Sequence, residues 1–361
     1  MKFKKYTLAE LATIKYGKNQ KKVLSENGTI PIYGTGGLMG YATESLYSEP
    51  SVLIGRKGTI GKVKYVDHPF WTVDTLFYTI VNTEIVLPKY LYYVMSLIDL
   101  NNYNEGTTIP SLRTETLNRL EFDIPSLEEQ ELILSCLNPI DEKIKINSEI
   151  NENLQQQAQA IFSKMFETED ADLWNSGTLS DIAEITMGQS PSGNSYNEDG
   201  QGPVFFQGRA EFGFRFPTVR LFTTEPKRMA LKNDTLMSVR APVGDLNIAH
   251  EDCCVGRGLA AIRSKDNHQS FVHYTMFSLQ KELDVFNGEG TVFGSINRNS
   301  LNAMPIKLPP QELIDEFEDL VSPIDALILS NHDATCRLKA IRDTLLPRLL
   351  SGELDVSDFD I

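Results

Sequence analysis

The stretch LNPIDEKIKINSEINENLQQQAQAIFSKMF (137–166) has a second copy in this chain, VSPIDALILSNHDATCRLKAIRDTLLPRLL (321–350), at a constant separation of 184 residues. In the first copy, apolar and amide side chains recur at alternating spacings of four and three residues, and the second copy keeps this pattern up to Asn331 and follows it more loosely after that. That spacing is typical of helices that pack along a seam. We expect Asn138 and Ser322 to cap these helices, each with proline as its first helical residue. The repeat therefore predicts two long helices that pair with one another.

The seam of the predicted helix pair is mostly apolar, with one asparagine at the same place in each copy. Asn147 and Asn331 are these equivalent residues. The predicted seam residues are Ile140, Ile144, Asn147, Leu154, Ile161, Ile324, Ile328, Asn331, Leu338 and Leu345. Because a seam asparagine can fix the register of paired helices, we expect the two asparagines to do so here.

A shorter helix is expected just before the first long one. Ser126 and Glu129 have the spacing of a capping box, in which each residue satisfies a backbone N–H of the other. This pair predicts a helix at 127–136, separate from the helix that starts at Pro139.

The repeat extends beyond the helices into the regions before them. LAELATIKYGK (8–18) matches LSDIAEITMGQ (179–189), and the segment 104–125 matches GEGTVFGSINRNSLNAMPIKLP (288–309). Between these matches, short strand-like segments alternate with glycine-rich turns, and one helix-like stretch follows. We therefore predict an α+β fold with two α+β domains in tandem repeat. The predicted segments are 1–125, a helical spacer at 126–170, 171–309, and a second helical spacer with the tail at 310–361.

The net charge of −15 is confined to the helical segments. Residues 126–170 hold three basic and ten acidic residues, and residues 310–361 hold four and twelve, so their balances of −7 and −8 account for all of it. The two α+β segments are together neutral. An acidic chain argues against binding nucleic acid through a general basic surface but leaves local basic clefts possible.

The N-terminal sequence indicates no export or membrane insertion. MKFKKYTLAEL is basic but has no apolar signal core, and no run of eighteen apolar residues occurs in the chain. We therefore expect a cytoplasmic protein.

Motifs that bind cofactors or carry out catalysis are missing from the sequence. IGRKGTIGKV (54–63) resembles a phosphate-binding loop, but five residues rather than four separate Gly55 from Gly61, and Val63 replaces the Ser or Thr that would bind magnesium. The five histidines have no metal-ligand spacing, and no serine-nucleophile or zinc-protease motif occurs. The sequence therefore predicts a non-enzyme without a cofactor or metal of its own.

Basic and polar loop residues at equivalent places in the two α+β segments are the candidate DNA contacts. Arginine can donate two hydrogen bonds to guanine, glutamine can pair with adenine, and glycine lets a backbone approach the duplex closely. The candidates in the first segment are Lys18, Tyr33, Thr35, Arg56, Lys57, Lys62 and Arg113. Those in the second are Gln207, Arg209, Arg215, Arg220, Arg240, Arg257 and Arg298. Each could instead be an ordinary solvated residue, but the loops differ strongly between the copies while the flanking sequences match.

The whole chain resembles the specificity (S) subunits of type I restriction–modification systems. The resemblance rests on the order domain, helix, domain, helix, on LAELATIKYGK and LSDIAEITMGQ at the domain starts, on SVRAPVGDLNIA with VGRGLAAI, and on the ending RDTLLPRLLSGEL (342–354). It implies two target-recognition domains that each read one half of a bipartite double-stranded DNA site. It also implies that the two helices form an antiparallel coiled coil.

The resemblance assigns the chemistry to other subunits. Two methyltransferase (M) subunits would bind the helices and methylate adenine N6 with S-adenosylmethionine, and restriction (R) subunits would use ATP and Mg²⁺ to translocate and cleave DNA. A helix from 139 to 166 would be roughly 42 Å long, which predicts half-sites about one DNA turn apart. Two alternatives remain open. One is a single-chain enzyme, and the other is an inhibitory or orphan S-like scaffold that binds M subunits without reading DNA.

Overall fold

The computed structural model describes residues 1–288 and 294–356, and its fold is α+β, as the sequence predicts. Part of the repeated segment 288–309, namely residues 289–293, lies outside this description. The chain forms two compact units. The first contains Met1–Asn147 and the C-terminal segment from Asp333, and the second contains Ser148–His332. Each unit therefore combines one β-rich domain with one half of each long helix, while the sequence-based boundaries at 125, 170 and 309 stay predictions.

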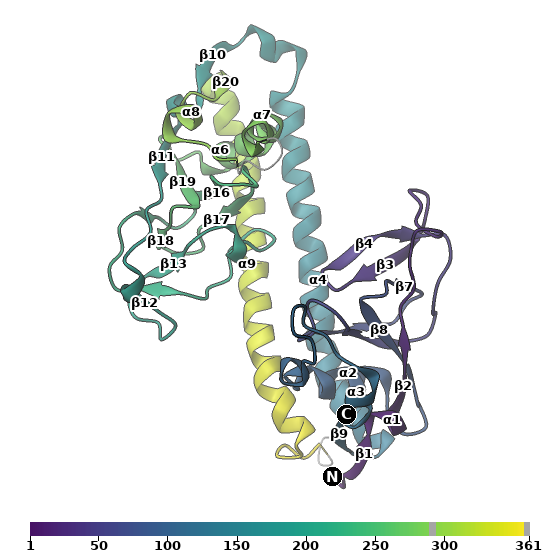
Figure 1. Cartoon of the computed structure of the whole chain (residues 1–361). Coiled ribbons are helices and arrows are strands. Elements are labelled where there is room, and N and C mark those ends of the chain that lie inside the picture. The colour runs from purple at the N-terminus through teal and green to yellow at the C-terminus, as the bar shows by residue number, and fades with distance from the viewer. Residues whose placement is uncertain (289–293, 357–361) are drawn as a thin grey trace. The chain divides into compact units, whose positions relative to one another are not determined.

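The two long helices are α4 (Leu127–Phe166) and α9 (Gln311–Leu350), each 40 residues long (Figure 1). They run antiparallel, because residues later in α4 contact residues earlier in α9. In the first unit, Asn147 Nδ2 donates to Thr335 Oγ1 at 3.2 Å. In the second, the Phe162 and Phe317 rings lie 5.6 Å apart, edge to face. The predicted pairing of long helices is confirmed.

The expected helix starts at Pro139 and Pro323 are wrong. The first helix begins at the Ser126–Glu129 capping box, where the Ser126 N–H donates to Glu129 Oε2 at 3.0 Å, and it continues through Pro139. An internal proline costs a helical hydrogen bond. Leu134 and Leu137, five and two residues before the proline, are buried in the core of the first unit, and that burial offsets the cost. Each helix is therefore about 60 Å long rather than 42 Å.

The first unit contains three small antiparallel or mixed sheets and the helices that cover them. The sheet orders are β2-β8-β5-β6, β4-β3-β7 and β1-β9. The strands are β1 (Lys4–Thr7), β2 (Ala12–Tyr16), β3 (Ile30–Gly34), β4 (Gly37–Ala42), β5 (Ser51–Gly55), β6 (Val63–Val66), β7 (Trp71–Thr72), β8 (Leu76–Val81) and β9 (Glu121–Ile124). The helices before α4 are α1 (Leu8–Leu11), α2 (Pro88–Ser96) and α3 (Thr114–Asn118). The largest apolar core, which includes Leu8, Phe77 and Tyr90, joins the β2-β8-β5-β6 and β1-β9 sheets and α2 to the neighbouring helix halves, and the β4-β3-β7 sheet packs in smaller clusters.

The second unit repeats this arrangement. Its sheet orders are β11-β19-β16-β17, β12-β14-β13-β18-β15 and β10-β20. The strands are β10 (Asn175–Thr178), β11 (Ala183–Met187), β12 (Tyr196–Asn197), β13 (Val204–Phe206), β14 (Phe222–Thr223), β15 (Met229–Ala230), β16 (Thr235–Ser238), β17 (Leu246–Ile248), β18 (Cys253–Val255), β19 (Leu259–Ser264) and β20 (Pro305–Leu308). The helices before α9 are α5 (Leu179–Ile182), α6 (Gln269–Ser278), α7 (Gln280–Asp284) and α8 (Arg298–Asn302). A parallel strand pair, β3 with β7 and β13 with β18, recurs at the same place in both copies.

The aspartate of each Pro-Ile-Asp repeat joins a long helix to its domain. Asp141 on α4 accepts a hydrogen bond from the Tyr93 hydroxyl of α2 at 2.5 Å and forms an ion pair with Arg342 of α9 at 3.2 Å. Asp325 on α9 accepts from the Tyr274 hydroxyl of α6 at 2.9 Å. Burial, followed by the hydrogen bond to Asp141, raises the pKa of Tyr93, so its hydroxyl stays a donor. The repeated motif therefore anchors domains and does not start helices.

Among the residues that the structure describes, no helix has both the length and the apolar character of a membrane span. The cytoplasmic location stays a prediction.

Candidate nucleic-acid interface

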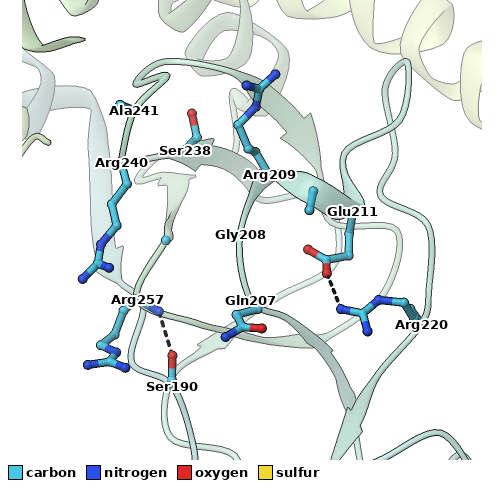
Figure 2. Close-up of a pocket in the computed structure, with 12 residues that line it drawn as sticks. Ser190, Gln207, Gly208, Arg209, Glu211, Arg220, Ser238, Arg240, Ala241 and Arg257 are labelled. Carbon is cyan, nitrogen blue, oxygen red and sulfur yellow. Dashed lines mark hydrogen bonds and ion pairs between the residues drawn. The ribbon is translucent and has the colours of Figure 1, made fainter. Parts of the chain in front are cut away.

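Five of the seven candidate residues in the second domain line one surface depression of about 400 Å³. They are Gln207, Arg209, Arg220, Arg240 and Arg257. The depression lies where β13, β16 and β18 end, so loops that follow strands of two different sheets converge on it. In Figure 2, Arg240 and Arg257 stand on one side, Arg209, Glu211 and Arg220 on the other, and Gln207 and Gly208 between them. The fold thus gathers side chains that are up to 50 residues apart in the sequence.

Two of the four arginines are held by carboxylates. Arg220 donates to Glu211 Oε1 at 2.9 Å, and Arg209 forms an ion pair with Asp245. In the parts of the chain that the structure describes, no hydrogen bond or ion pair holds the guanidinium group of Arg240 or Arg257. Both side chains are exposed. The depression therefore keeps two arginines available for an anionic or hydrogen-bonding ligand.

The remaining two candidates of the second domain lie elsewhere. Arg215 is 3% exposed, and its guanidinium group donates to Asp325 Oδ1 at 2.5 Å and to the Tyr274 hydroxyl at 3.0 Å. It anchors the domain to α9, so we leave it out of the interface. Arg298 is exposed at the start of α8 and lines a different depression together with Lys265.

A depression of about 440 Å³ occupies the corresponding place in the first domain. Three candidates line it, namely Tyr33, Thr35 and Lys62. Lys64 of β6, which the sequence did not single out, lies with its ammonium group 3.8 Å from the centroid of the Tyr33 ring. Partial burial lowers the pKa of Lys64. The Tyr33 hydroxyl in turn lies 3.0 Å from His68 Nε2, so polar groups lie both at the ring face and at the hydroxyl of this tyrosine.

The other candidates of the first domain do not line that depression. The Arg56 guanidinium group lies over the Tyr16 ring at 4.9 Å and donates to the Asp74 carbonyl at 2.9 Å. Arg113 forms an ion pair with Glu105 at 3.1 Å. Lys18 and Lys57 are exposed on neighbouring loops. The first domain therefore presents a less basic and more aromatic site than the second.

The two depressions are related by the repeat. Lys57 lies two residues after β5, and Arg240 lies two residues after β16, which is the equivalent strand of the second copy. Each forms an isolated β-bridge with a serine, Lys57 with Ser111 and Arg240 with Ser295. A glycine-rich turn lies in each site, Gly36–Gly37 in the first and Gly208 in the second. No heavy atom of another described residue would meet a Cβ at Gly36 or Gly208, so the backbone there is open to a ligand. The scaffold is shared, while the lining side chains differ.

Several site residues carry no sequence signal. Glu211 and Asp245 are acidic residues among arginines, and only the fold shows that they pair with Arg220 and Arg209. Outside the two depressions, the rings of His250 and His332, which are 82 positions apart in the sequence, also meet only in the fold: their centroids lie 5.7 Å apart in the second unit, with Phe216 beside both. The alternation of β6, by contrast, could have indicated Lys64, because it places Lys64 on the opposite face from Val63 and Tyr65.

A family model described as "Type I restriction modification DNA specificity domain" matches residues 1–156 and again 171–344. The two matches correspond to the two copies of the repeat, so each copy contains one such domain with a helical segment.

Individual relatives are named as specificity subunits of type I restriction enzymes. The chain is 32% identical over 299 residues to a putative type I restriction enzyme MjaX specificity subunit of Methanocaldococcus jannaschii, covering 76% of this chain and 70% of the relative. It is 25% identical over 345 residues to the MjaIX specificity subunit of the same organism, covering 87% and 79%. In fold, it is similar to the crystal structure of a type I S subunit from M. genitalium, with a TM-score of 0.60, 19% identity and coverage of 97% and 96%.

Members of this family are the specificity subunits of their systems; they are not catalytic and carry no cofactor themselves. The repeat of domain and helix, the paired long helices and the double match of the family model agree with one another. The chain belongs to the family of type I restriction–modification DNA specificity subunits.

Proposed function

We propose that each β-rich domain reads one half of a bipartite DNA site through the depression at its strand ends. The observation that supports this most is the convergence of Gln207, Arg209, Arg220, Arg240 and Arg257 on one depression. These are the residue types that read base edges and bind phosphates. A major groove is about 12 Å wide and admits such a loop cluster.

The two half-sites should differ in sequence. The second domain offers Gln207 and two arginines, Arg240 and Arg257, whose guanidinium groups no described residue holds. The first offers Tyr33, Thr35, Lys62 and Lys64. Lysine is a point charge that suits phosphates, while the arginine fork suits guanine. The complete site should therefore be asymmetric, with an unread spacer between its halves.

The paired helices are proposed to bind the methyltransferase subunits rather than DNA. Their segments hold the whole acidic excess of the chain, and an acidic surface repels the phosphate backbone. Methyl transfer to adenine and ATP-dependent cleavage would then take place in partner subunits that the helices hold near the half-sites.

A selection experiment tests this proposal. The full chain, assembled with its methyltransferase subunits, is used to select binding sites from a pool of random DNA duplexes. The proposal predicts one motif with two unlike halves and a fixed spacer. A continuous motif or a palindrome would contradict two-domain readout. Binding of methyltransferase subunits without any selected motif would favour the inhibitory or orphan scaffold instead.

A further inference from the structure

Glu211 is the acidic residue within the arginine-rich depression of the second domain, and only one of its two carboxylate oxygens has a partner among the described residues. Oε1 accepts a hydrogen bond from Arg220 at 2.9 Å. Oε2 has no hydrogen-bond partner in the part of the chain that the structure describes. Figure 2 shows Oε1 joined to Arg220 and the other oxygen directed toward the interior of the depression. An unpaired buried acceptor is costly, so its retention at a ligand site calls for a ligand that completes it.

Burial makes this carboxylate a fixed feature of the site. Glu211 is 7% exposed, and its backbone is tied by the Thr218 N–H, which donates to the Glu211 carbonyl at 2.7 Å. The arginine side chains beside it are much more exposed, at 48% for Arg209 and 54% for Arg220. Arg209 can turn toward a phosphate when DNA arrives, while Arg220 keeps its hydrogen bond to Oε1, so that a base edge can reach Oε2.

We infer that Glu211 is a specificity-determining residue that accepts a hydrogen bond from the exocyclic amino group of one base in the half-site read by the second domain. Cytosine N4 and adenine N6 carry such donors in the major groove, whereas guanine O6 and thymine O4 are acceptors there. A keto oxygen placed against Oε2 would leave two acceptors facing each other without a proton between them. The site would therefore select an amino-bearing base at that position and reject a keto-bearing one. This inference rests on the proposed function.

Glu211→Gln is the informative substitution, because it is nearly isosteric. The amide oxygen can still accept from Arg220, while the amide NH₂ takes the place of Oε2 and turns the acceptor into a donor. The base preference at one position should then shift from adenine or cytosine toward guanine or thymine by about tenfold or more, the size of one good base contact. Glu211→Ala should lose the preference at that position without reversing it.

Asp245→Asn is the matched control. It removes the same negative charge from beside another arginine of the same depression, but Asp245 already has Arg209 as its partner. This variant releases Arg209, so it can change overall affinity, but it should not exchange amino-bearing for keto-bearing bases at the position that Glu211 reads.

The experiment is selection from random duplexes with the full chain and its methyltransferase subunits, carried out with the wild type and the three variants, each checked for folding by thermal unfolding. A reversal confined to one position of one half-site in Glu211→Gln, with the preference at that same position unchanged in Asp245→Asn, would support the inference. If the wild type selects a motif, and both Glu211→Gln and Glu211→Ala select that same motif, the inference is overturned while the proposed function stands. A wild type that selects no motif would contradict the proposed function itself.

Discussion

Arg240 and Arg257 are the side chains on which DNA binding by the second domain should depend most, because no partner within the described structure holds their guanidinium groups. We predict that the double variant Arg240→Ala, Arg257→Ala binds DNA more weakly. If an arginine reads a base, its loss should cost about 1–3 kcal/mol of binding free energy. If these arginines bind phosphates instead, the slope of log K against log salt should fall by about 0.9 for each. Fluorescence anisotropy at several salt concentrations measures both quantities.

Lys232→Ala is the control for this double variant. Lys232 is also exposed and basic, but it precedes β16, whereas Arg240 follows that strand at its other end. An equal weakening of DNA binding in Lys232→Ala and in the arginine variant would show that the depression is not the binding surface.

His273 should make the stability of the second unit depend on pH. Its imidazole is 2% exposed, with Nδ1 3.1 Å from Thr235 Oγ1, and burial, followed by the charge of Arg215, lowers its pKa well below 6.5. The folded state thus disfavours the protonated form. Below about pH 6.5 the unfolded chain gains a proton that the folded chain does not bind, so stability falls by about 1.4 kcal/mol per pH unit.

Urea unfolding between pH 7.5 and 5.5 checks this prediction. The free energy of unfolding of the wild type should fall more steeply with decreasing pH than that of His273→Gln, which has no imidazole to titrate. Parallel pH profiles would contradict it. Because every other ionisable group is common to both proteins, the difference between the two profiles reports His273 alone.

The residue types in the sequence indicated which side chains could contact DNA, but not whether each one is buried, paired or exposed in the fold. Arg215 and Arg240 are the same residue type in glycine-containing loops. Arg215, however, is buried and bonded to Asp325, whereas Arg240 lines the depression. Phe214 and Phe216 on either side of Arg215 were a sign of an apolar setting, which a search for polar motifs ignores. Glu211 could not be found this way, because its role depends on the position of Arg220 in space.

At the scale of the helices, the two equivalent seam asparagines differ in their bonding. Asn147 is 1% exposed, and its Oδ1 has no partner in the described structure. Asn331 donates to Asn151 Oδ1 at 3.0 Å, and Asn151 donates to the Ile328 carbonyl at 3.0 Å. Asn331 therefore belongs to a chain of hydrogen bonds, while Asn147 has one acceptor that no described residue satisfies.

These interactions predict opposite effects on stability. Asn147→Leu should stabilise the protein slightly, by less than about 1 kcal/mol, since removal of the unpaired buried oxygen outweighs the loss of the hydrogen bond that Nδ2 donates to Thr335. Asn331→Leu should destabilise it by about 1–2 kcal/mol, since Asn151 Oδ1 loses its donor. Chemical denaturation gives both values, and a destabilised Asn147→Leu would contradict the assignment.

The same asparagines are proposed to fix the register of the pair, as single seam asparagines can. The double variant should accept more than one spacer length between half-sites. An unchanged spacer would count against a register role.

Helix periodicity predicted the existence and pairing of the long helices, but not where they begin. Local rules place proline at a first helical position. Here, burial of Leu134 and Leu137 carries the helix through Pro139, and that burial depends on a domain formed by distant residues. The repeat of Pro-Ile-Asp was visible in the sequence. Its role as an anchor was not, because Tyr93 and Tyr274 reach Asp141 and Asp325 only in the folded chain.

For the whole molecule, the internal repeat was the most predictive sequence feature. It indicated two similar domains. In the structure, the four-stranded sheet has the same strand order in each and the same parallel strand pair recurs, while the sheet that contains this pair has three strands in the first domain and five in the second. What the repeat could not indicate is that each compact unit combines halves of both helices, since α4 and α9 are separated by more than 140 residues of sequence. That division follows from antiparallel packing.

The central claim is that each domain reads its own half of the DNA site. Replacing residues 171–309 with the equivalent domain of another specificity subunit keeps α4, α9 and the first domain. Methylated adenines are then mapped across the genome in cells that carry either the native or the hybrid chain with the same methyltransferase subunits. We expect one half of the methylated motif to change while the other half is retained. A change in both halves, or in neither, would contradict the claim.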